Sequence, residues 1–349
     1  MPIPLDGPRD RPDLVAAVAR AAAAIGGLDH ALAGHPLLQA VLYRARLDAV
    51  RRAAAVDGHA IDPWHLAAIL EGLRLRMDPY LSMLDRGAIF DAARHAFDQY
   101  QWLVTPDFDQ EGEVQAAEKA LAGTSATTPL IAGGRGFHAW IDRGGDRRAG
   151  RAALIRFWRR QSVLRAPFPL VGAASLRAEG SWEFSDWLPA FLTALAGEAE
   201  DGLQLVMTLE RAWFTARTKA AGRRSTSRAG LAIDVMAAAP LVSATSLGRA
   251  LGMAAQNAGA LLDRFSLEGI VLEVSHRSKR RLYGLAELAP LRDGVAPPRR
   301  PQPGRGRGRP PLPLIEEEVP AGPPPLPPLT PLERRSFDYS GLEAAMAFA

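Results

Sequence analysis

The chain has 349 residues, which is long enough for two or three domains and a sizeable buried core. It contains no cysteine, so disulfides and thiolate metal sites are excluded, and a reducing cytoplasm is the expected location. The net charge is +4, and charged residues interrupt every apolar run before the ~20 residues that a membrane span requires. We therefore expect a folded protein with no membrane segment, no metal site and no cofactor.

Residues 1–125 are expected to be a helical N-terminal region. A first helix begins near residue 13 and, because glycine disfavours helix, is expected to stop near Gly26-Gly27. A second helix repeats apolar residues at helical spacing and ends at Asp57-Gly58. Two further helix starts are predicted, because an Asp that can cap a helix precedes a Pro that suits the first helical position: Asp62-Pro63 and Asp78-Pro79.

Residues 126–220 are expected to be a second helical region. The stretch 124–150 is rich in Gly and Thr and predicts loops, and an amphipathic helix follows over 151–163. Two helices are expected within 183–220. The polar, basic stretch 221–229 predicts a linker to a separate unit.

Residues 230–290 predict a different kind of unit, with short helices and then strands. The first helix is stopped by Pro240. The second has an N-cap at Ser243, Thr245 or Ser246 and ends at Gly252, where glycine suits a left-handed turn. A third helix precedes two short strands, "IVLEV" and "RLYGL", of which the second is expected to be half buried. Helix, helix, tight turn, helix and hairpin is the pattern of a winged helix-turn-helix.

The third of these helices is the expected recognition helix. Its core-facing side chains would be Ala258, Leu261, Leu262 and Phe265. The other side carries Gln256, Asn257 and Arg264. Gln and Asn can form two hydrogen bonds with adenine in the major groove, and Arg can reach guanine or phosphate. We therefore predict double-stranded DNA as the partner, and a homodimer is left open.

The loop between the two strands is strongly basic. It carries four cations in five positions: Arg277, Lys279, Arg280 and Arg281. A wing of this kind lays its cations along phosphates or into the minor groove. Because side chains alternate along a strand, Arg281 should point away from Arg280, so two or three of the four should contact DNA. The alternatives are a solvated hairpin with ordinary surface charge and a winged helix that docks on a protein.

The C-terminal part of the chain is rich in proline. Residues 295–335 are expected to be a disordered Pro- and Arg-rich linker, because this composition cannot bury a core. Within it, Arg307-Gly308-Arg309-Pro310 is similar to the core of an AT-hook, whose arginines enter the narrow minor groove of A·T tracts. Residues 336–349 predict a short C-terminal helix.

Residues 35–215 resemble the Fic family in two segments. The first, "LLQAVLYRARLDAVRRAAAVDGHAIDPWHLAAILEG", is similar to the Fic N-terminal region with its inhibitory-helix motif, but Ala53 replaces the hydroxyl residue and Asp57-Gly58 replaces Glu-Gly. The second, "HAWIDRGGDRRAGR", is similar to the Fic active-site loop, with His138 and Asp142 at the family's spacing. The remaining matches need a two-residue insertion: Gly145, Arg148, Gly150 and Arg151.

Two substitutions in this loop disfavour Fic activity. The family's loop cradles nucleotide phosphates at a helix N-terminus, where Gly allows close approach. Asp146 stands where the family has Asn and would set a negative charge against the phosphates, and Arg147 stands where the family has Gly. We therefore expect a degenerate or repurposed site with no catalytic residue. The alternative is a Fic-like nucleotidyl (AMP) transferase that uses His138 as its base.

Nearly the whole chain is also similar to a family of rhizobia and related alphaproteobacteria, described as a domain of unknown function followed by a helix-turn-helix DNA-binding domain. The stretch "SATSLGRALGMAAQNAGALLDRF" and the basic run up to "RLYGL" carry this resemblance. It implies DNA binding. The prediction is a mainly α protein, with a helical body, a winged helix-turn-helix and a disordered tail, that acts as a transcriptional regulator. A protein-docking scaffold that never meets DNA is the third class that stays open.

Overall fold

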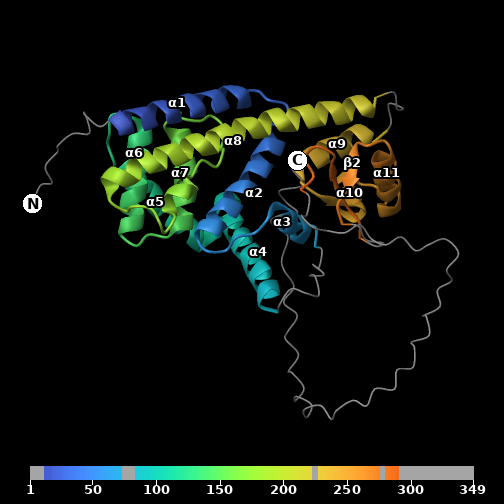
Figure 1. Ribbon diagram of the computed structural model, residues 1–349, viewed down its shortest axis with the longest axis horizontal. Helices are drawn as coiled ribbons and strands as arrows, with labels where there is room; N and C mark the ends of the chain where they lie inside the picture. Colours follow the sequence, from blue (N-terminus) through green and yellow to red (C-terminus); the bar gives the residue numbers. More distant parts are fainter. Residues whose placement is uncertain (1–11, 73–82, 222–226, 276–279, 291–349) are drawn as a thin grey trace, which may run out of the picture.

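The computed structural model describes residues 12–72, 83–221, 227–275 and 280–290, and this part of the chain is mainly helical (Figure 1). The helices of the body are α1 (Pro12–Leu32), α2 (Leu38–Val56), α3 (Pro63–Leu70), α4 (Met83–Val104), α5 (Phe108–Ala122), α6 (Pro129–Asp142), α7 (Arg147–Arg160) and α8 (Phe184–Lys219), with a short 3-10 turn at Ala173–Leu176. The C-terminal unit, residues 227–290, contains α9 (Ala229–Ala238), β1 (Val242–Ser243), α10 (Ala244–Leu251), α11 (Ala255–Leu267), β2 (Val271–Glu273) and β3 (Leu282–Leu285).

The long helix α8 organises the molecule. It runs from the helical body to the C-terminal unit, and α1 lies along it (Figure 1). The sequence predicts two helices here, which is wrong, because residues 184–219 form one continuous helix. Pro189 lies near the start of α8, where it disturbs few backbone hydrogen bonds. The apolar side chains of α8 join one continuous core that extends from α1 to β3.

Helix α1 continues past the point where the sequence predicts its end. It runs through Gly26 and Gly27 to Leu32, because Ile25, Leu28 and Leu32 are buried and this packing outweighs the low helix propensity of glycine. By length and composition α1 is the one helix among the described residues that could cross a membrane. Six of its side chains, among them Leu14, Ile25 and Leu28, are buried in the core shared with α8.

The stretch 124–150 is not a loop, and the prediction for it is wrong. It contains α6 and the start of α7, and Thr128 caps α6 by accepting a hydrogen bond from the N–H of Ile131. The glycines of α6 are sites of close packing. A Cβ at Gly136 would lie 2.8 Å from the backbone of Leu121, and one at Gly134 would lie 2.7 Å from Leu188. These glycines allow α6 to pack closely against neighbouring helices, although glycine in a sequence more often indicates a loop.

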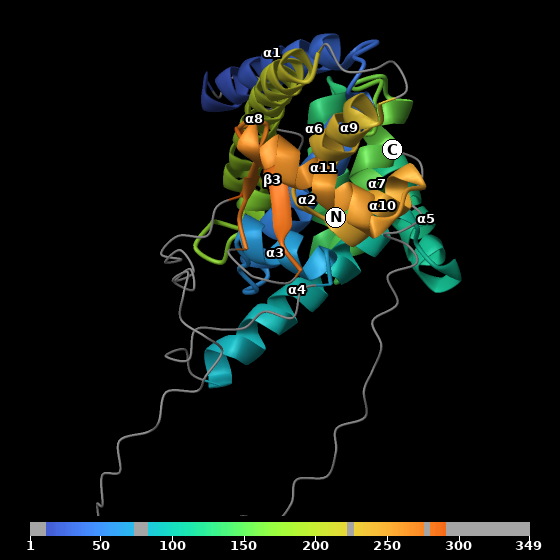
Figure 2. The same cartoon turned by 90° about the vertical axis from the view of Figure 1, so that its right-hand side faces the viewer.

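The C-terminal unit contains a three-stranded antiparallel sheet with the strand order β1-β3-β2. The sequence predicts β2 and β3 but not the two-residue strand β1. All four residues of β3 are buried, in contrast to the half-buried strand that was predicted. The reason is that β3 is central in the sheet and covered on both faces. Leu282 packs against α3 of the body, whereas Tyr283 and Leu285 belong to the core of α9, α10 and α11. Figure 2 shows β3 among the helices of this unit.

Candidate nucleic-acid interface

Helix α10 is fixed at both ends by features that the sequence predicts. Ser243 is its N-cap and forms a capping box with Ser246, since each side chain accepts a hydrogen bond from the other's backbone N–H. Gly252 ends the helix in the left-handed conformation, with φ at 60°. The tight turn also needs Gly248, because a Cβ there would lie 2.8 Å from the carbonyl oxygen of Met253. These local rules set α10 and α11 at a close crossing.

Helix α11 has one buried and one exposed face. Ala258, Leu262 and Phe265 are fully buried and Leu261 is partly buried, so the predicted core face is confirmed. The polar residues predicted to face DNA are all exposed: Gln256, Asn257 and Arg264. Asn257 and Arg264 are two turns apart and lie in one row, with Gln256 in the neighbouring row. In Figure 1, α11 lies at the end of the molecule that is farthest from α5 and α6.

A hydrogen-bonded ion pair connects α11 to β3. Asp263 of α11 accepts a hydrogen bond of 2.8 Å from the hydroxyl of Tyr283 and forms an ion pair of 2.7 Å with Arg281. The hydrogen bond from Arg281 is the largest cause that holds the pKa of Asp263 below its usual value, and the Tyr283 hydroxyl adds to it. The Arg281 guanidinium also lies 5.5 Å from the ring centroid of Tyr283. Sequence reasoning missed this connection, since no periodicity relates the two positions.

The structure places two of the four basic loop residues. Arg280 is exposed and adopts a left-handed conformation with φ at 53°. Arg281 is partly buried, and its guanidinium donates a hydrogen bond of 2.8 Å to Asp263. Four of the predicted DNA-contacting residues lie outside the described part of the chain: Arg277, Lys279, Arg307 and Arg309. The same holds for the predicted helix start at Asp78-Pro79, the Pro-rich linker and the helix at 336–349.

Two charged side chains of the body, Glu71 and Arg44, bind helix ends of the C-terminal unit. Glu71, which follows α3, accepts hydrogen bonds from the N–H of Ser243 at 2.9 Å and the hydroxyl of Ser246 at 2.7 Å. Its carboxylate therefore lies at the N-terminus of α10, where the helix dipole favours negative charge. Arg44 of α2 donates hydrogen bonds to carbonyl oxygens at the C-terminal end of α9. The C-terminal end of α9 and the N-terminal end of α10 thus each have a partner in the body.

In the loop that resembles the Fic active site, the Asp146 carboxylate occupies the N-terminus of α7. Asp146 caps α7 by accepting hydrogen bonds from the N–H groups of Arg148 and Ala149, so the helix N-terminus already has an anion. Burial opposes ionisation of Asp146, but the Arg148 hydrogen bonds hold its pKa below the usual value. The His138 ring stacks on Trp182 at a centroid distance of 4.4 Å and its Nε2 donates to the Trp182 carbonyl oxygen.

The two segments that carry the Fic resemblance meet in space. Arg151 of the loop segment donates hydrogen bonds to Asp57 of the first segment at 3.1 and 3.3 Å. Arg147 and His95 contact the same carboxylate. Burial alone would raise the pKa of Asp57, but these contacts outweigh burial and lower it. The Arg151 side chain is only 2% exposed, so this ion pair is a central part of the fold.

Among the described residues no group of His, Asp and Glu side chains is arranged to hold a metal ion. No protein-family model matches the chain, and no curated protein matches it.

Proposed function

We propose that the C-terminal unit is a winged helix-turn-helix that binds double-stranded DNA, and that the protein is a cytoplasmic transcriptional regulator. The observation that carries the proposal is the exposed face of α11, on which Gln256, Asn257 and Arg264 stand together without a covering element among the described residues. An α-helix fits the major groove, and these side-chain types can bond to base edges.

The elements around α11 support this assignment. The α10–α11 turn is the compact connection that a helix-turn-helix needs, and Gly248 and Gly252 make it possible. The β2–β3 hairpin follows α11 and carries exposed Arg280 at its end. In this arrangement α11 would read bases while Arg280, Arg277 and Lys279 would contact phosphates or the minor groove. The resemblance to the alphaproteobacterial family points to the same function.

The contacts of the Fic-like loop argue against the competing enzyme. A nucleotide phosphate at the N-terminus of α7 would meet the Asp146 carboxylate, which already accepts two backbone hydrogen bonds there. The Nε2 proton of His138 is donated to a carbonyl oxygen, and Trp182 covers the ring. A general base needs an unprotonated nitrogen that faces its substrate, and in this arrangement Nε2 of His138 is protonated and engaged. We infer that this region serves as a structural body.

Selection from a pool of random double-stranded DNA tests the proposed function. The wild-type chain should enrich a defined sequence, and the triple variant Gln256→Ala, Asn257→Ala, Arg264→Ala should lose that preference. Ser266→Ala is the matched control, because Ser266 is exposed on α11 and lies on the side opposite Asn257 and Arg264. Failure of the wild-type chain to retain DNA even at low salt would move the protein-docking alternative ahead, and transfer of label from ATP that is lost in His138→Ala would favour the enzyme.

A further inference from the structure

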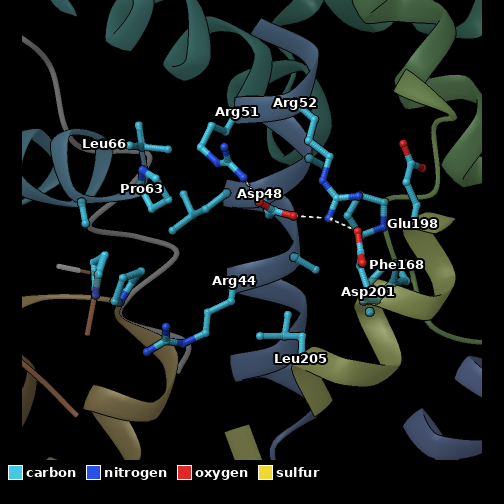
Figure 3. Close-up of a pocket in the computed structure, with 18 of the residues that line it drawn as sticks. Arg44, Asp48, Arg51, Arg52, Pro63, Leu66, Phe168, Glu198, Asp201 and Leu205 are labelled. Atoms are coloured by element: carbon cyan, nitrogen blue, oxygen red, sulfur yellow. Dashed lines mark hydrogen bonds and ion pairs between the residues drawn. The ribbon is translucent and has the colours of Figure 1, made fainter. Parts of the chain in front are cut away.

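A cleft of about 400 Å³ lies where the helical body meets the C-terminal unit (Figure 3). Helix α2 lines it together with parts of α3 and α8, and the C-terminal unit contributes Pro240, Leu288 and Pro290. Its volume is in the range of cavities that hold small organic molecules. Any molecule in this cleft would therefore touch the body and the C-terminal unit at once.

Arg44 is the feature of the cleft that points to a ligand. Its Nε and Nη2 atoms donate to the carbonyl oxygens of Ala237, Met236 and Ala239 at 2.6, 3.1 and 3.2 Å. Within the described ranges its Nη1 has no hydrogen-bond partner, and no carboxylate forms an ion pair with it. Burial lowers the pKa of Arg44 to about 10, so the side chain remains a cation at neutral pH. A half-buried cation beside a cleft attracts an anion.

The other charged side chains of the cleft already have partners. Asp48 lies between Arg51 and Arg52 and forms an ion pair with each, and Arg52 also lies 3.4 Å from Asp201. The buried Glu198 carboxylate accepts three backbone hydrogen bonds, from the N–H groups of residues 171–173. These carboxylates are therefore not available to Arg44. Among the described residues Arg44 is thus a cation without a carboxylate partner, and it lies beside Arg51 and Arg52, whose charges are paired with Asp48.

The rest of the lining is largely apolar. Leu205 and Phe168 contribute apolar surface from the body side, and Leu288 contributes it from the C-terminal unit. Figure 3 shows Leu66, Pro63 and Leu205 around the same space as Arg44 and Asp48. A ligand that matches this lining has one anionic group and an apolar part, because an ion without an apolar part would leave that surface unfilled.

We propose that this cleft binds a small amphipathic organic anion, with its carboxylate on Arg44 and its apolar part between Leu205 and Leu288. Arg44 also donates hydrogen bonds to the C-terminal end of α9. An anion bound in the cleft therefore changes the contact between the body and the C-terminal unit. The second part of the proposal rests on the proposed function: the bound anion alters the affinity of the C-terminal unit for DNA.

Matched probes that differ only in charge test the binding site on the full chain. Benzoate and octanoate should raise the melting temperature saturably. The neutral amides benzamide and octanamide should bind at least about tenfold more weakly, and the amines benzylamine and octylamine should give no shift. Sodium chloride at equal ionic strength is the control for general salt effects. Equal shifts for the acids, amides and amines, or no shift from either acid, would overturn the site.

Two variants locate the probe in the cleft. Arg44→Gln removes the cation, and Leu205→Trp fills the cleft while leaving the Arg44 hydrogen bonds in place. Each should weaken benzoate binding by at least about tenfold. Met207→Trp is the matched control, because Met207 is exposed on α8 outside the lining of the cleft. If Arg44→Gln fails to fold, Leu205→Trp still tests whether benzoate binds in the cleft. Undiminished benzoate binding in Leu205→Trp would contradict the proposed site.

The DNA readout separates this proposal from the proposed function. Saturating benzoate should change DNA affinity by several-fold in the wild-type chain and in Met207→Trp, but not in Leu205→Trp. Benzoate binding that leaves DNA affinity unchanged would overturn the coupling. If the chain binds no DNA at all while benzoate binding still depends on Leu205, the proposed function fails and the ligand site stands.

Discussion

Asp263 on α11 binds Tyr283 on β3 and Arg281, which directly precedes β3, and so connects the exposed helix to the basic hairpin. One of the four clustered cations is therefore engaged within the protein. The side chains of Asp263 and Arg281 are 46% and 39% exposed, so the ion pair itself contributes no more than about 1 kcal/mol to stability. The ion pair matters because it connects α11 to the hairpin and because it leaves Arg281 less able to contact another group.

Asp263→Asn should release Arg281 without unfolding the unit. The amide keeps an acceptor for the Tyr283 hydroxyl but loses the ion pair, so the free energy of unfolding should fall by no more than about 1 kcal/mol. The freed cation and the lost negative charge should strengthen binding to any DNA sequence. We expect the slope of log affinity against log salt to steepen by about 0.9. A shallower slope in a folded variant would show that the ion pair itself is needed for DNA binding.

The two amides of α11 should determine sequence preference. Gln256→Ala and Asn257→Ala should each reduce discrimination between the selected site and a mismatched site by about 1–3 kcal/mol if that residue makes a bidentate base contact. Affinity for non-specific DNA should change little. Ser266→Ala again serves as the control. Full sequence preference in both amide variants would mean that another face reads the DNA.

Arg280 offers a substitution that removes charge without disturbing the backbone. Its φ of 53° favours glycine, so Arg280→Gly should relieve backbone strain of about 1 kcal/mol and leave the fold intact. If Arg280 contacts one phosphate, the salt slope should fall by about 0.9 and all sequences should weaken alike. Arg280→Lys, which keeps the charge, is the control for charge. A salt slope unchanged by Arg280→Gly would remove this residue from the interface.

The buried pair of Asp57 and Arg151 should give the body an acid-sensitive core. The pKa of Asp57 lies below its ordinary value of 3.8, so its contribution to stability is complete above that value and is lost as pH falls through the folded-state pKa. Asp57→Asn leaves the Arg151 charge buried without its partner and should cost about 3–5 kcal/mol at neutral pH. Urea unfolding across the acid range checks both points.

The control for that experiment is Glu200→Gln. Glu200 forms an ion pair with Arg20 in which both side chains are about half exposed, so its removal should have little effect at any pH. The Asp57→Asn chain should also lose less stability than the wild type when the pH is lowered below 4, since the titrating group is gone. If the free energy of unfolding fell equally with pH in the wild type and in Asp57→Asn, the role assigned to Asp57 would be contradicted.

The Pro-rich tail should contribute DNA affinity without contributing stability. Removal of residues 295–349 should leave cooperative melting nearly unchanged, because such a composition does not belong to a core. The double variant Arg307→Ala, Arg309→Ala should weaken binding to sites with A·T-rich flanks more than to sites with G·C-rich flanks. Fluorescence anisotropy on both kinds of site measures the difference. Equal losses on both would argue against an AT-hook.

Local rules predicted the parts of the structure that local chemistry decides. The N-caps at Asp62 and Ser243, the left-handed turn at Gly252 and the apolar face of α11 are all as expected from neighbouring residues. The exposure of Gln256, Asn257 and Arg264, which we propose to contact DNA, follows from the same periodicity. These features need only the spacing of residues within one helix or turn, so one sequence is enough to find them.

Long-range contacts decided what the sequence did not show. Gly133, Gly134 and Gly136 look like loop residues until Trp158, Leu188 and Leu121 are seen to fill the space beside them. The attachments of Arg44 to α9 and of Glu71 to α10 join residues that are far apart in the chain. Helix α1 passes its two glycines because α8 lies along it. No local pattern carries this information.

The packing of the C-terminal unit against the body determines whether the unit can fold alone. One core extends from α1 to β3, and Trp64 of α3 packs directly on the sheet of the C-terminal unit. A cut in the linker would therefore not release an autonomous module, since the separated unit would expose the apolar face that α3 covers and lose the helix-end partners Arg44 and Glu71. Residues 227–290 expressed alone should melt early and aggregate, and grafting them onto another protein should fail unless α3 is grafted with them.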